Sequence, residues 1–136
     1  MIRDKSGEHP AVRGLGQAVL VIDDNDVDRE AIAECLRAVG LVVHDLPSPI
    51  GATRKARELN VGVVVIDQNL PAMDGSRLAA LFRGNPQMRS IRLVLVSGND
   101  ASMMAEITRQ AQADAFVSKR DIQRELAKTV LRLLPQ

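Results

Sequence analysis

The sequence has almost no aromatic side chains. Phe82 and Phe116 are the only two, and tryptophan and tyrosine are absent from all 136 residues. Proteins that bind single-stranded nucleic acid stack its bases on aromatic side chains, so this shortage argues against such a surface. The formal net charge is only +1, so no strong field favours nucleic acid or an acidic substrate. We therefore expect no direct contact with nucleic acid.

Cysteines and long apolar runs are also scarce. Cys35 is the single cysteine, so the chain cannot form an internal disulfide, which fits a reducing cytoplasm. No apolar run approaches the length of a membrane-spanning helix, and the N-terminus lacks the apolar core of a signal peptide. We expect a cytoplasmic protein without a membrane partner.

Five short apolar runs alternate with five amphipathic stretches. The runs are typical of strands buried on both faces of a parallel sheet, and we expect strands at 18–23, 41–43, 61–67, 91–96 and 114–118. The expected helices begin near Asn25 or Asp26, at Ser48-Pro49, at Gly75, near Asn99 or Asp100, and at Asp121. This alternation predicts a doubly wound α/β fold with right-handed crossovers. The five-stranded, flavodoxin-like (βα)5 version has strand order 2-1-3-4-5.

The chain is long enough for one domain with a single ordinary core. Residues 1–16 are polar and contain three glycines and a proline, and we expect a flexible N-terminal arm there. Residues 17–136 then form the folded domain, and no residues remain for a separate output domain.

Polar side chains stand at the ends of four of the expected strands. Asp23 and Asp24 end the first strand, Asp67 ends the third, Ser97 follows the fourth, and Lys119 follows the fifth. The carboxyl ends of parallel strands share one edge of the sheet, where open α/β sheets bind ligands. Three carboxylates gathered there repel one another, and a small hard cation such as Mg²⁺ (or Mn²⁺) relieves that repulsion. A carboxylate can accept a phosphoryl group, whose remaining oxygens an ammonium and a hydroxyl can hold.

With these residues and the loop Pro71-Ala72-Met73-Asp74-Gly75, the sequence resembles the receiver domain of bacterial two-component response regulators. The resemblance extends from about Gln17 to about Leu134 and is to single-domain, chemotaxis-regulator-like receivers. It implies that Asp67 is the phospho-acceptor and that a sensor histidine kinase or a phosphotransfer protein is the donor. The chain would then be a signalling domain that assists its own phosphotransfer and dephosphorylation, and not a conventional enzyme.

The resemblance also implies roles for the residues around the acceptor. The metal would be bound directly by Asp24, by Asp67 and by the backbone carbonyl of Asn69, and through water by Asp23. Lys119 would pair with the phosphoryl group.

The same resemblance implies a switch. Ser97 matches the switch hydroxyl and Phe116 the switch aromatic, and their movement would change the surface of the fourth helix, fifth strand and fifth helix. We expect Met103, Met104 and Val117 on or near that surface, which would control an unidentified protein partner. The protein would be a monomer or a weak dimer through the same surface.

In one place the sequence departs from this family. The lysine is usually followed by a proline in a cis peptide, but Arg120 follows Lys119. A cis bond before a non-proline residue costs about 2.5–4 kcal/mol, so either the site supplies that free energy or the bond is trans. The position of Lys119 depends on which of these holds.

Two other functions remain open. One is a phosphatase of the haloacid-dehalogenase type, because Asp24 and Asp26 have the spacing of its two aspartates. That reading puts Asp28 where a hydroxyl or small apolar residue is expected, and it leaves Asp67 without a role. The other is a docking scaffold that is no longer phosphorylated. Such receivers typically lose an acid, the hydroxyl or the lysine, and none of these is lost here.

Overall fold

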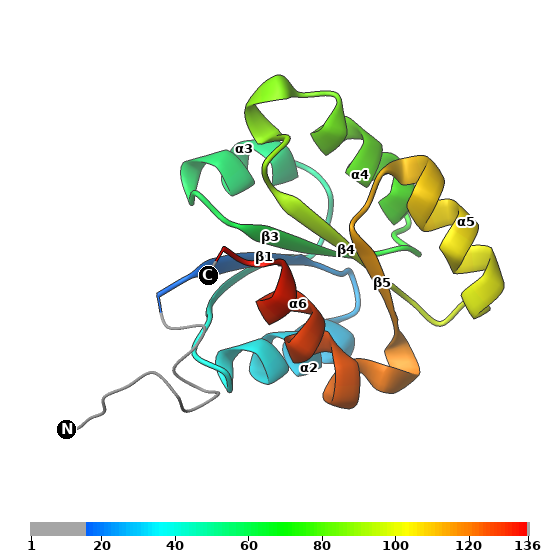
Figure 1. Ribbon diagram of the computed structural model, residues 1–136, viewed down its shortest axis with the longest axis horizontal. Coiled ribbons are helices and arrows are strands. Elements are labelled where there is room, and N and C mark those ends of the chain that lie inside the picture. The colour runs from blue at the N-terminus through cyan, green and yellow to red at the C-terminus, as the bar shows by residue number, and fades with distance from the viewer. Residues whose placement is uncertain (1–15, 136) are drawn as a thin grey trace.

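A five-stranded parallel sheet runs through the centre of the computed structural model, which describes residues 16–135 (Figure 1). The strands are β1 (Ala18–Ile22), β2 (Val42–Leu46), β3 (Val63–Asp67), β4 (Arg92–Ser97) and β5 (Ala115–Ser118). Their order across the sheet is β2-β1-β3-β4-β5, and every neighbouring pair is parallel. The expected doubly wound α/β fold and its strand order are confirmed.

Helices cover both faces of this sheet. On one face lie α2 (Asp26–Arg37) and α6 (Ala127–Leu133), and on the other lie α3 (Ala52–Glu58), α4 (Gly75–Arg83) and α5 (Ala101–Ala111) (Figure 1). The described residues also form three short helical segments: the 3-10 turns η1 (Pro86–Met88) and η2 (Lys119–Asp121), and the π-helical turn η3 (Ile122–Leu126). None of the helices in residues 16–135 is long and apolar enough to cross a membrane.

The core lies in two layers, one on each face of the sheet. Successive side chains of a strand point to opposite faces, so Ile66 packs in the layer with Phe82 of α4, whereas Val65 packs in the layer with Leu36 of α2. All five residues of β3 are buried, as its unbroken apolar run predicts. Leu81 of α4 is 52% exposed, whereas Leu78 and Phe82 of the same helix are buried.

Two boundaries on the β2 side of the sheet differ from the sequence-based expectations. β2 continues to Leu46 instead of ending at 43, because it pairs with β1 along its whole length and, as an edge strand, accepts polar residues that are only partly buried. The expected helix start at Ser48-Pro49 is wrong. These residues form a turn in which the Ser48 hydroxyl accepts from the Ile50 N–H, and α3 begins only after Gly51, whose φ is +76°.

The beginning of the last helix also differs. Asp121 was expected to cap it, but the carboxylate of Asp121 makes no capping bond and instead accepts from Arg124. The cap is Ser118, whose hydroxyl accepts from the Arg120 N–H at the start of η2. Regular α-helix begins only at Ala127, after the π-helical turn. The arm expected over residues 1–16 lies, apart from Gly16, outside the described residues.

Candidate functional site

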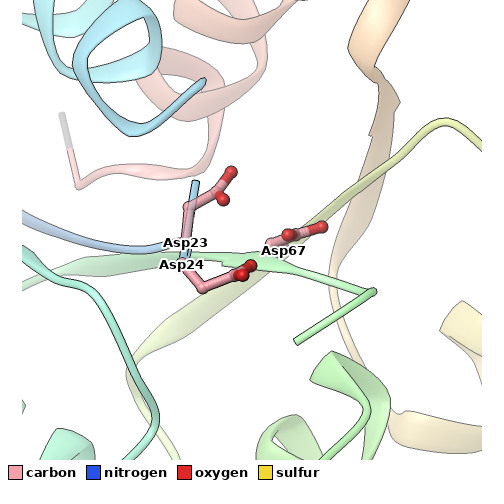
Figure 2. Close-up of side chains that lie close together, drawn as sticks. All are labelled: Asp23, Asp24 and Asp67. Carbon is pink, nitrogen blue, oxygen red and sulfur yellow. The ribbon is translucent and has the colours of Figure 1, made fainter. Parts of the chain in front are cut away.

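Three aspartates meet at the carboxyl ends of β1 and β3 (Figure 2). Asp23 and Asp24 directly follow β1, and Asp67 is the last residue of β3. β1 and β3 are hydrogen-bonded neighbours, so their ends lie side by side. One carboxylate oxygen from each aspartate lies within 4.8 Å of the others. The structure thus brings together the three acids that the sequence placed at this edge.

Asp23 is the most deeply buried of the three, with no exposed surface. Its Oδ1 accepts from the Asn25 N–H at 2.9 Å, whereas its Oδ2 has no hydrogen-bond partner among the described residues. Burial raises the pKa of Asp23 from 3.8 to about 6. The nearby charge of Asp67 adds to the rise, and the Asn25 N–H and Lys119 oppose it. A buried carboxylate oxygen without a partner is unfavourable unless an ion or water satisfies it.

Asp67 is also buried, with 3% of its surface exposed. Its Oδ1 accepts from the Asn69 N–H at 3.1 Å and lies 3.5 Å from the Lys119 ammonium. Asn69 itself is exposed in the turn that follows β3. The same oxygen of Asp67 is therefore held by its own turn and lies close to a positive charge.

Lys119 reaches this cluster from the end of β5. Its Nζ lies 3.6 Å from Oδ2 of Asp23, but its shortest contact is a 2.8 Å hydrogen bond to Oδ2 of Asp28. Partial burial acts to lower the pKa of Lys119, but the hydrogen bond to Asp28 and the charges of Asp67 and Asp23 outweigh it and raise the pKa. Sequence reasoning missed Asp28 as a member of the site. The available signal was an acid in the first turn of the helix that follows the aspartate pair.

The peptide bond after Lys119 is trans, as no cis bond occurs in the described part of the chain. The backbone therefore continues from Lys119 into the 3-10 turn that Ser118 caps. This resolves the question raised by Arg120: the lysine stays at the cluster without a cis bond.

Ser97 and Phe116 lie on neighbouring strands beside the cluster. Ser97 is fully buried at the end of β4, where its hydroxyl accepts from the Asn99 N–H at 2.9 Å. Phe116 is partly exposed, is paired with Leu95 in the sheet register and packs in the core layer under α5. Leu95 and Ser97 are two residues apart on β4, so their side chains lie on the same face. Ser97 and Phe116 are thus positioned on one face of the sheet.

The residues expected on or near the surface around Phe116 differ in their exposure. Met103 is 55% exposed, but Met104 and Val117 are buried in the two core layers. Phe116 lines a surface pocket of about 220 Å³ between β5, α5 and the segment from η2 to α6. Val117 also lines this pocket, whereas Met104 is buried in the core layer under α5.

Gln68 also belongs to the site's framework, although no sequence pattern indicated a role for it. It is buried directly after Asp67, where its side-chain Oε1 accepts from the Ser76 N–H at 2.8 Å and its Nε2 donates to the Ser76 hydroxyl at 3.2 Å. Asp74, in the N-cap position of α4, makes no side-chain capping bond. Gln68 therefore caps α4 from the turn after β3 and ties this helix to the end of that strand.

The donor set fits a small divalent cation. Mg²⁺ and Mn²⁺ prefer oxygen ligands such as carboxylates, and three carboxylate oxygens converge here. The Oδ2 of Asp23, which accepts no hydrogen bond from the described residues, would be satisfied by such an ion or by its bound water. Lys119 by itself brings one positive charge to Asp23, Asp28 and Asp67, so the cluster keeps a negative charge that attracts a cation.

The sequence matches the family model of the response regulator receiver domain over residues 19–131. Protein PilG of Pseudomonas aeruginosa is similar to this chain, with 24% identity over 120 residues that cover 88% of this chain and 89% of PilG. The acids, hydroxyl and lysine described above lie within the matched range.

Solved structures of response regulators share the fold. Chemotaxis response regulator CheY4 of Vibrio cholerae superimposes with a TM-score of 0.78 at 22% identity, over 87% of this chain and 98% of CheY4. The Mn²⁺-bound form of response regulator Rcp1 gives a TM-score of 0.72 at 16% identity, over 88% of this chain and 99% of Rcp1. At such identities the likeness shows the fold alone, and the family assignment comes from the sequence match. The chain belongs to the response regulator receiver domain family of two-component signalling.

Proposed function

We propose that this receiver domain accepts a phosphoryl group on Asp67 in a reaction that requires Mg²⁺ or Mn²⁺. The observation that carries this proposal is the position of Asp67. Its buried carboxylate lies beside the carboxylates of Asp23 and Asp24, and its Oδ1 is 3.5 Å from the Lys119 ammonium. Phosphoryl transfer requires little of a protein beyond positioning and neutralisation of charge, and this arrangement provides both.

Asp24, Asp67 and the backbone carbonyl of Asn69 would hold the cation directly, and Asp23 would hold it through water. When bound, the cation would neutralise part of the charge on the carboxylates and on the oxygens of the incoming phosphoryl group. The buried Oδ2 of Asp23, which accepts no hydrogen bond from the described residues, supports this assignment. The Mn²⁺-bound form of Rcp1, a structure with the same fold, supports the binding of a divalent cation.

The donor would be the phosphohistidine of a sensor histidine kinase or a phosphotransfer protein. An oxygen of Asp67 attacks phosphorus, the new O–P bond forms, and the P–N bond breaks. The imidazole leaves with the electron pair and takes up a proton. The Lys119 ammonium then pairs with one phosphoryl oxygen. Ser97 still has its hydroxyl proton to donate to another, because its Oγ only accepts from the Asn99 N–H.

The phosphorylated state would change the surface around Phe116. Movement of the buried Ser97 toward the phosphoryl group vacates space on the face of the sheet that Phe116 shares. Phe116 then turns inward, and the surface of α5, β5 and the segment from η2 to α6 changes shape. The phosphoryl group needs only to shift an equilibrium between two such arrangements. A protein partner or a second copy of this chain would recognise the new surface.

The phosphatase alternative is not favoured. It requires Asp26 to act beside Asp24, but the carboxylate of Asp26 is 86% exposed and pairs with Arg29 at 2.7 Å. The scaffold alternative predicts no phosphoryl transfer at all, so one experiment separates it from the proposal.

The test is phosphorylation of the purified protein by acetyl phosphate with Mg²⁺, followed by intact mass spectrometry. We expect one added phosphoryl group in the wild type and in Asp74→Asn, which removes an exposed acid from the loop after the acceptor. We expect none in Asp67→Asn, and none in the wild type with EDTA. An unmodified wild type, or an Asp67→Asn variant that is still labelled, would overturn the proposal.

A further inference from the structure

Lys119 makes its hydrogen bond to a residue other than the acceptor. Its Nζ lies 2.8 Å from Oδ2 of Asp28, within hydrogen-bond range, but 3.5 Å from Oδ1 of Asp67. The third carboxylate, that of Asp23, is 3.6 Å away. The ammonium is therefore held on the α2 side of the cluster. Its hydrogen bond is to Asp28 and not to Asp67, the residue that would carry the phosphoryl group.

Local structure fixes Asp28 in this position. Asp28 lies in the first turn of α2, and its N–H donates to Oδ1 of the N-cap residue Asn25 at 2.9 Å. The N–H of Asn25 in turn donates to Asp23. Asp28 is thus attached to the same turn that carries the aspartate pair. Ser118 fixes the backbone of Lys119, because it caps the 3-10 turn that begins with Lys119.

The contacts of Lys119 with Asp28 and with Asp67 differ in their exposure to water. The side chain of Asp28 is 39% exposed and that of Lys119 is 25% exposed, whereas that of Asp67 is 3% exposed. Water screens an ion pair between partly exposed groups, so such a pair is weak and exchanges readily. A phosphoryl group on buried Asp67 would add charge where screening is weaker, and charge-assisted hydrogen bonds to it are strong.

We propose that Asp28 is a positioning residue, which holds the Lys119 ammonium before phosphorylation and competes for it with the phosphoryl group on Asp67. This inference rests on the proposed function of Asp67. It implies that formation of the phosphorylated state includes the transfer of the ammonium from Asp28 to the phosphoryl oxygens. Removing the carboxylate of Asp28 removes the competitor and stabilises that state.

Beryllofluoride, an analogue of the phosphoryl group, tests the proposal through its apparent affinity with saturating Mg²⁺. We expect Asp28→Asn to bind beryllofluoride about three- to fivefold more tightly than the wild type. This ratio corresponds to the free energy of a partly exposed ion pair. Glu30→Gln is the matched control, because it removes one acid from the same helix. Glu30 pairs with Arg37 and is not a partner of Lys119. The affinity of Glu30→Gln for beryllofluoride should therefore equal that of the wild type. An equal gain in both variants, or no gain in Asp28→Asn, would overturn the proposal.

A double-mutant cycle separates competition for Lys119 from simple repulsion between Asp28 and the analogue. If Asp28 acts through the ammonium, the gain from Asp28→Asn disappears in a Lys119→Gln background. If the gain persists there, Asp28 acts by direct repulsion and the proposal fails.

A second measurement requires no variant. In a crystal structure of the wild type with Mg²⁺ and beryllofluoride, we expect Nζ of Lys119 to lie beyond about 4 Å, the limit of an ion pair, from Asp28. An intact Lys119–Asp28 hydrogen bond in that complex would contradict the proposal. Wild-type protein that binds no beryllofluoride with Mg²⁺ would instead refute the proposed function of Asp67. Binding by the wild type with an unaltered Lys119–Asp28 pair would refute this inference alone.

Discussion

Gly75 lies directly against the backbone of Asp67. A Cβ at position 75 would be 2.4 Å from the Asp67 carbonyl oxygen and 2.9 Å from the Cα of Gln68. The Gly75 N–H donates to the Gln68 carbonyl oxygen at 2.9 Å. The first residue of α4 therefore rests on the end of the strand that carries the candidate acceptor, and only a residue without a side chain permits this approach.

Gly75→Ala should destabilise the protein. The added methyl group would contact backbone atoms, which cannot rotate away as a side chain can, so α4 or the end of β3 must shift. We expect a loss of about 1–3 kcal/mol in the free energy of unfolding, as for other overpacked sites, measured by urea denaturation. Gly84→Ala at the other end of α4 is the control. A Cβ at position 84 would lie 3.5 Å from its nearest neighbour, the Ala80 carbonyl oxygen. We therefore expect the free energy of unfolding to change by no more than about 0.5 kcal/mol. Similar losses in both variants would contradict this explanation.

Gln68→Ala should destabilise the same junction for a different reason. Its buried amide makes two hydrogen bonds to Ser76 at the start of α4, and alanine would leave the Ser76 N–H without this partner. We expect a loss of about 1–2 kcal/mol in the free energy of unfolding. Asp74→Ala should change it by less than about 0.5 kcal/mol, since Asp74 makes no side-chain capping bond. A larger loss in Asp74→Ala than in Gln68→Ala would show that the cap has been misassigned.

Asp23 should make stability depend on pH. Its pKa rises from 3.8 to about 6 on folding, so the folded state binds its proton more tightly than the unfolded state does. The contribution of Asp23 to stability is then greatest below about pH 4 and falls as the pH rises to about 6. Above that range the buried negative charge is a net cost, and Asp23→Asn should be more stable than the wild type by about 1–3 kcal/mol at pH 7.

Denaturant unfolding at a series of pH values, without divalent cations, measures this difference. The stability gained by Asp23→Asn should shrink toward zero as the pH falls from about 6 to about 4. Glu30→Gln, on the exposed face of α2, should show no such trend. A gain that is the same at every pH would mean that burial of the Asp23 charge is not its cause.

Mg²⁺ should stabilise the folded protein by binding to the aspartate cluster. A ligand that binds only the folded state at about 100 times its Kd adds about 2.7 kcal/mol to stability. The melting temperature of the wild type should therefore rise with Mg²⁺, as measured by calorimetry. Asp24→Asn should lose most of this rise, since it removes an exposed carboxylate of the cluster, while Glu30→Gln should keep it. An undiminished rise in Asp24→Asn would place the cation elsewhere.

The sequence by itself determined the architecture and the edge at which the site lies. The apolar runs that become β1, β3 and β4 are buried on both faces, and their alternation with helices allows few topologies. Asp23, Asp67 and Ser97 come directly at the ends of those strands. Parallel strands end at a shared edge, so their position in the chain already implied their proximity.

Only the tertiary structure decided which groups touch at that edge. The bond between Lys119 and Asp28 joins residues 91 positions apart, and no local pattern indicates which of several acids an ammonium will contact. The cap that Gln68 provides and the close approach of Gly75 likewise depend on how α4 docks on β3. Strand and helix patterns arise from interactions between neighbours in the chain, whereas these contacts arise from distances between segments that meet only when the sheet and its helices pack together.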